Sequence, residues 1–201
     1  MDYEKYLIYN FVMKKLLITI LFLMFASPCF AEEMSKSQQA VAFYNDNNIE
    51  EAIKILQSIP EADKSASDWL LMGNLLQDKN MNAEAVFMFK RSILTDKNFY
   101  KAHYNLGNMY LAEERPLMAI DSFKNAIKIK PDFAYGYYNI GCAYFRLGDY
   151  KKAKRYFEKA ITLKNTEPDF QYNLALCYKN LNKPKLAQRH LDFYNQLIEN
   201  R

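Results

Sequence analysis

The chain has 201 residues, of which 50% are hydrophobic and 25% charged, with only five glycines and six prolines. This composition is typical of an ordinary folded chain with one domain. The formal net charge is +4, and the charges are scattered, which argues against the basic stripe of a nucleic-acid-binding surface.

Residues 1–31 differ from the rest of the chain and have the three parts of a secretory signal peptide. The segment 13–15 is Met-Lys-Lys, an apolar run follows over 16–26, and 27–31 (Ser-Pro-Cys-Phe-Ala) ends in a small-x-small cleavage pattern. The apolar run of 11 residues is short for a membrane span, which needs about 20. Cleavage at the end of this pattern would leave a mature chain that begins at Glu32.

Some features of the leader leave alternatives open. Residues 1–12 are either an upstream extension of a long signal peptide, or the true start is Met13. Cys29 faintly resembles a lipoprotein cleavage site, but Pro28 directly before it departs from that pattern, and the run could also stay uncleaved as an anchor. We expect cleavage after Ala31 and export to the periplasm or cell envelope.

After the leader, the chain repeats itself with a period of 34 residues. The last four units keep this register without insertion and cover 66–99, 100–133, 134–167 and 168–201. A degenerate unit precedes them over 33–65, where four side chains occupy the same columns displaced by one residue: Ala40, Phe43, Ala52 and Leu56. An atypical first unit is expected at the end of a repeat array, because one of its faces meets water.

Four columns of side chains define the repeat. The eighth position of the units holds Gly73, Gly107, Gly141 and Ala175, the eleventh Leu76, Tyr110, Tyr144 and Tyr178, the twentieth Ala85, Ala119, Ala153 and Ala187, and the twenty-fourth Phe89, Phe123, Phe157 and Leu191. Small residues at the eighth and twentieth positions let two helices approach closely, and the large residue at the twenty-fourth fills the space beside them. A fixed period of this length indicates a stacked-repeat solenoid.

The motif of each unit resembles the tetratricopeptide repeat. In the third unit it reads His103-x-x-Leu106-Gly107-x-x-Tyr110, then Ala119-x-x-x-Phe123 and a late Pro131. The resemblance implies an all-α fold, an α-solenoid of stacked antiparallel helix pairs that winds as a right-handed superhelix. It also implies a scaffold that binds protein or peptide partners.

By this resemblance, the first helix of each unit lines a concave groove, and its fifth, sixth and ninth positions point into that groove. These positions hold the candidate protein-binding residues Asn74, Tyr104, Asn105, Asn108, Tyr138, Asn139, Tyr172 and Asn173. An asparagine amide offers two donors and an acceptor to the backbone of an extended peptide, and tyrosine adds flat apolar contact. The alternative is that these asparagines only cap or solvate their helices.

The same family implies a known way to grip acidic peptide tails, but this chain lacks the residues for it. The carboxylate clamp requires basic side chains where this sequence has Leu70, Tyr135 and Asn139. The cluster 151–155 (Lys-Lys-Ala-Lys-Arg) is the longest basic run, and we interpret it as a solvated helix face.

No motif indicates catalysis, a metal or a cofactor. His103 occupies the column that holds Trp69 and Tyr137 in other units, so we expect it to pack rather than react. Cys142 and Cys177 lie 35 residues apart on adjacent first helices, and we expect two free thiols, because packed helices are separated by more than a disulfide spans.

The sequence therefore predicts an exported scaffold that binds protein or extended peptide, without nucleic acid or cofactor, in assembly or maintenance of a cell-envelope complex. A membrane-anchored assembly factor, held by a lipidated Cys29 or an uncleaved leader, is the alternative. An enzyme with an unrecognised site is the weaker alternative.

Overall fold

The computed structural model describes residues 34–200, and this part of the chain is helical throughout, apart from its turns. The predicted signal peptide, with Met13, Cys29 and the cleavage site after Ala31, lies outside the described residues. The helices are α2 (Lys36–Asn45), α3 (Ile49–Gln57), the short 3-10 helix η1 (Glu61–Asp63), α4 (Ala66–Asp78), α5 (Asn82–Thr95), α6 (Tyr100–Ala112), α7 (Pro116–Ile129), α8 (Ala134–Arg146), α9 (Tyr150–Leu163), α10 (Pro168–Asn180) and α11 (Pro184–Glu199).

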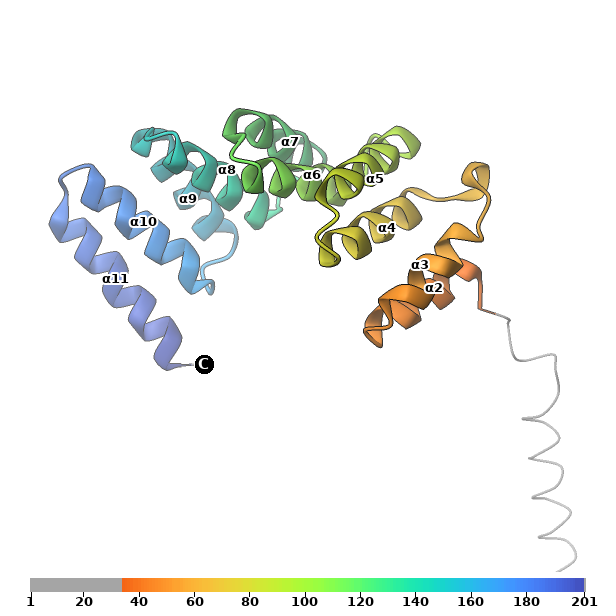
Figure 1. The fold of residues 1–201 in the computed structure, drawn as a ribbon. Coiled ribbons are helices and arrows are strands. Elements are labelled where there is room, and N and C mark those ends of the chain that lie inside the picture. Colours follow the sequence, from red (N-terminus) through yellow and green to blue (C-terminus); the bar gives the residue numbers. More distant parts are fainter. Residues whose placement is uncertain (1–33, 201) are drawn as a thin grey trace, which may run out of the picture.

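The helices form antiparallel pairs that stack into one curved array (Figure 1). The first helices of the last four pairs begin at Ala66, Tyr100, Ala134 and Pro168, which is a spacing of 34 residues. Each first helix packs against its own second helix and against the second helix of the pair before it. The predicted fold class, an all-α solenoid of stacked helix pairs, is confirmed.

Helix starts follow from local capping chemistry. At the start of α4, the Ser65 hydroxyl accepts the backbone N–H of Asp68, and the Asp68 carboxylate accepts the backbone N–H of Ser65, so two orphan donors are satisfied reciprocally. Ser35 forms the same arrangement with Gln38 at the start of α2. Three other helices, α7, α10 and α11, begin with proline, which lacks the N–H that a first turn leaves unpaired.

The turn inside each helix pair contains one residue in the left-handed backbone region. These residues are Asn47, Asn80, Glu114, Gly148 and Asn182, with φ between 56° and 75°, and the last four lie 34 residues apart. Glycine and asparagine adopt this conformation at low cost, which explains the breakers at these positions. Glu114 is the exception, because the left-handed conformation is energetically unfavourable for a glutamate.

The contact that holds each pair together joins the eighth and twenty-fourth positions. A Cβ added to Gly107 would lie 2.5 Å from the ring of Phe123, and one added to Gly141 would lie 2.6 Å from the ring of Phe157. The ring, rather than the partner backbone, therefore occupies the space that the missing side chain leaves. In the last unit, Ala175 faces a column in which Leu191 replaces phenylalanine, and here a Cβ is accommodated.

The core continues from one unit into the next. One buried cluster joins Phe89 of α5, Leu106 of α6, Phe123 of α7 and Ile140 of α8, so it spans three helix pairs. At the N-terminal end, Leu56 of α3 is fully buried in a cluster with residues of α2 and α4, which shows that the degenerate first unit is part of the stack. Each pair thus buries its apolar faces against its neighbours, as expected of a solenoid.

This part of the chain has no candidate for a membrane-spanning helix. Among residues 34–200, every helix is too short or too polar to span a bilayer.

The left-handed turn gives a clean stability test at Gly148. Its φ is 75°, and no described atom lies within 4 Å of where a Cβ would stand, so a substitution changes only the backbone energy. We expect Gly148→Ala to lower the free energy of unfolding by about 1–2 kcal/mol, and Gly148→Asn to lower it less, as measured by chemical denaturation. Unchanged stability of Gly148→Ala would contradict this turn geometry.

Candidate functional site

The candidate site is a ladder of asparagines on the first helices α4, α6, α8 and α10. In two steps of this ladder, the sixth position of one unit reaches the ninth position of the unit before it. Asn105 Nδ2 donates to Asn74 Oδ1 at 2.7 Å, and Asn139 Nδ2 donates to Asn108 Oδ1 at the same distance. These bonds link neighbouring units, and all four side chains are half-buried.

The third step of the ladder uses different acceptors. The ninth position of the fourth unit is Cys142 rather than asparagine, so Asn173 has no amide to bond there. Its Nδ2 donates instead to the Tyr138 hydroxyl at 2.8 Å and to the backbone carbonyl of Asp169 at 3.0 Å. Asn139 makes the equivalent tyrosine bond, to the Tyr104 hydroxyl at 3.2 Å.

These bonds limit which hydrogen-bonding groups of the ladder are available to a peptide. Asn139 and Asn173 each use both amide hydrogens within the chain, and Asn105 uses one. Their side-chain carbonyl oxygens carry no hydrogen bond among the described residues. The ladder is therefore a row of hydrogen-bond acceptors, one on each of α6, α8 and α10.

The tyrosines of the fifth position differ in accessibility. Tyr104 packs on Phe123 and Phe133, with ring centroids 5.7 and 4.9 Å away, and Tyr138 packs on phenylalanines of α9 and α10. Burial raises the pKa of both hydroxyls, which keeps them protonated. Tyr172 is the open member of the set, 41% exposed, with its ring 5.3 Å from that of Tyr194.

The structure places all eight predicted site residues on first helices and joins seven of them in these hydrogen bonds. The hydrogen bonds between these residues were not predicted from the sequence, where each asparagine was considered separately. A signal was present, since Asn74 and Asn105, like Asn108 and Asn139, are 31 residues apart, one helical turn short of the period.

Both cysteines of the described chain are free thiols. Cys177 is buried, and Cys142 packs at the edge of the same cluster, close to Tyr138. Burial raises the pKa of the Cys142 thiol to about 11 and that of Cys177 to about 12. At neutral pH both are protonated, and a protonated thiol is a poor nucleophile and metal ligand.

The two histidines have structural partners. His103 Nε2 lies 3.0 Å from the carbonyl oxygen of Lys97, and His190 Nδ1 lies 2.8 Å from Oε1 of Gln171. The His190 ring stacks on Tyr178, and burial lowers its pKa. Residues 34–200 contain no group of three histidine, cysteine or acidic side chains placed to hold a metal ion.

Comparison with known proteins supports the repeat assignment. The family model of the tetratricopeptide repeat matches residues 100–133 and 134–166. Over these two units the chain matches the tetratricopeptide repeat. None of the curated proteins resembles the chain closely enough to count as a match.

Solved structures of MamA share the fold of this chain. A crystal structure of MamA superposes with a TM-score of 0.74 at 22% identity, covering 80% of this chain and 95% of that one. MamA from residue 41 to its end, from Desulfovibrio magneticus RS-1, gives a TM-score of 0.74 at 20% identity, with 84% and 98% covered. At these identities the likeness shows a shared fold of stacked helix pairs.

The buried thiols give a test by labelling. In native protein at pH 8, we expect Cys142 and Cys177 to react slowly with a thiol reagent, and the rate to rise as the pH approaches 11, because only the thiolate reacts. In denatured, unreduced protein both should label at once, as identified by peptide mass mapping. Rapid native labelling at pH 8, or an unlabelled pair after denaturation, would contradict the structure.

Proposed function

We propose that this chain is an exported scaffold that binds an extended segment of a protein partner along its first helices. The observation that carries the proposal is the row of asparagine carbonyl oxygens on α6, α8 and α10, fixed by the bonds of Asn105, Asn139 and Asn173 to the preceding unit. An extended chain presents N–H groups at a regular spacing, so a row of fixed acceptors suits its backbone without reading its side chains.

Preorganisation supports this role. A free asparagine would lose side-chain freedom on binding, whereas Asn139 is already held by Tyr104 and Asn108 before any peptide arrives. The first helices α6 and α8 are each fixed by a buried contact of glycine with phenylalanine, so the acceptors of Asn105 and Asn139 stand on a rigid support. Tyr172 adds an exposed ring at one end of the row, of the type enriched in protein interfaces.

Export and a place in a cell-envelope assembly rest on the leader pattern of residues 1–31. The mass of the native N-terminus separates the outcomes. A chain that begins at Glu32 supports export by cleavage. A lipidated Cys29 or an intact leader supports the membrane-anchored alternative instead.

The binding role is tested by two changes of one asparagine. Asn139→Ala removes the acceptor and should lower partner capture by about tenfold, since an unpaired buried peptide group costs about 1–3 kcal/mol. Asn139→Asp keeps an acceptor oxygen but loses the amide hydrogens that bind Asn108 and Tyr104, so it should lower capture as well. Partners are captured by crosslinking from the cell envelope and quantified against wild type, after circular dichroism has shown intact helicity.

The matched control is Lys151→Ala, which changes an exposed residue on α9, away from the ladder. It should leave capture unchanged, because exposed charges contribute weakly. Equal capture by Asn139→Ala and Lys151→Ala would remove the ladder from the binding mechanism.

A further inference from the structure

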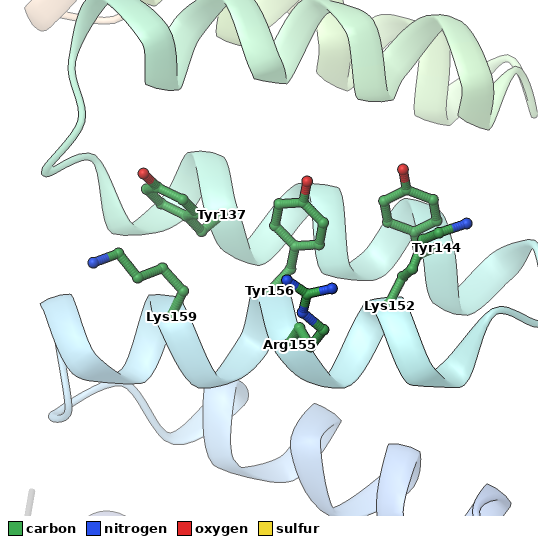
Figure 2. A pocket seen from close by; sticks show the side chains of 6 residues that line it. All are labelled: Tyr137, Tyr144, Lys152, Arg155, Tyr156 and Lys159. Atoms are coloured by element: carbon green, nitrogen blue, oxygen red, sulfur yellow. The ribbon is translucent and has the colours of Figure 1, made fainter.

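A second surface, apart from the asparagine ladder, has the features of a binding site. Between α8 and α9 lies a cavity of about 380 Å³, lined by three tyrosines and three basic side chains: Tyr137, Tyr144, Tyr156, Lys152, Arg155 and Lys159. Figure 2 shows the rings side by side along the two helices, with the basic side chains of α9 beside them.

The cavity lies on the opposite side of α8 from the ladder. Tyr137 and Tyr144 are seven residues apart, so they share one face of the helix, whereas Asn139 follows Tyr137 by two residues and is turned by about 200°. The wall of the cavity is rigid, since the rings of Tyr144 and Tyr156 stack with centroids 5.5 Å apart. A ligand here would leave the ladder free.

The basic side chains that line the cavity are not all paired with carboxylates. Lys152 pairs with Asp149 at 2.7 Å, but Arg155 and Lys159 have no carboxylate partner among residues 34–200. Lys159 Nζ instead lies over the ring of Tyr137, and the guanidinium of Arg155 is exposed. Like charges three and four residues apart on one helix face repel each other, so this arrangement favours a bound anion.

The basic set belongs to this unit alone. At the positions equivalent to Lys152, Arg155 and Lys159, the second unit has Glu84, Phe87 and Arg91, the third Met118, Asp121 and Asn125, and the fifth Leu186, Arg189 and Phe193. Arg91, which corresponds to Lys159, is paired with Glu61 at 2.8 Å. The core of the repeat therefore does not require three cations here.

We propose that this cavity binds an acidic segment of a protein partner, with glutamate or aspartate carboxylates on Arg155 and Lys159 and the apolar parts of the segment on the tyrosine rings. A guanidinium pairs with a carboxylate through two parallel N–H donors. Tyrosine and arginine are among the side chains enriched at interface hot spots. The site is a second contact surface and does not depend on the ladder.

The test uses a rhodamine-labelled peptide, Glu-Glu-Phe-Glu-Glu-Leu, and fluorescence anisotropy with the full chain. The double variant Arg155→Gln/Lys159→Gln should weaken binding at least tenfold. The control Lys151→Gln/Lys185→Gln removes the same charge from exposed positions on α9 and α11 and should change the dissociation constant less than twofold. A peptide with glutamine in place of glutamate should bind at least tenfold more weakly, and its remaining binding should be the same in the double variant and in wild type.

Three outcomes would overturn the proposal. Equal weakening by both double variants would mean that the peptide senses only the general positive charge. Competition by inorganic phosphate at concentrations as low as the peptide's dissociation constant would mean a small-oxyanion site. Absence of peptide binding up to millimolar concentration would mean no site for acidic segments. The loss of binding in Arg155→Gln/Lys159→Gln should be the same with and without Asn139→Ala, so failure here is separate from failure of the ladder.

Discussion

The contact between a phenylalanine ring and a glycine of the facing helix is the constraint on which the rest of the structure depends. In three units the ring of the twenty-fourth position fills the space where the glycine of the eighth position has no side chain. Phe89, Phe123 and Phe157 are all fully buried by this contact. The close approach fixes the second helix on the first, and the next pair then packs on both. The first helices, and the asparagines on them, take their places through this contact and through the packing of each pair on the next.

The architecture lets surfaces vary while the core repeats. The columns that hold the stack use few positions of each unit, so the remaining positions can differ from unit to unit. The ladder uses this freedom on the first helices, where Cys142 replaces the asparagine of the ninth position and Asn173 takes tyrosine and backbone acceptors instead. The positions that line the basic cavity, on the other side of α8, also vary between units, and one unit alone carries three basic side chains there.

The fold could be predicted from the sequence because its cause is periodic. Glycine, alanine and phenylalanine recur at fixed positions, and the left-handed turns at Asn80, Gly148 and Asn182 recur with them. The prediction went less far for the site, because its chemistry depends on pairs of units. Whether Asn139 faces solvent or the amide of Asn108 is decided by the offset between two helices, which a single column does not reveal.

The basic cavity shows a second limit of sequence reasoning. The cluster 151–155 was interpreted as a solvated helix face, and for Lys151 the structure agrees, since this side chain is exposed. Lys152 and Arg155 are exposed too, but they also line a cavity with tyrosines of the preceding helix, α8. Only the packing of α8 on α9 brings these groups together.

The central claim, that the ring and the glycine determine each other, is tested most directly by a double-mutant cycle at Gly141 and Phe157. In the wild-type background, Gly141→Ala should destabilise the protein by about 1–3 kcal/mol, because the added Cβ overlaps the ring. In the Phe157→Leu background, which mimics the pair Ala175 and Leu191, the same change should stabilise it, since alanine is the better helix former by about 1 kcal/mol. The free energies of unfolding are measured by chemical denaturation of the four proteins. If Gly141→Ala changes stability by the same amount in both backgrounds, the two positions are not coupled, and the account of the stack is wrong.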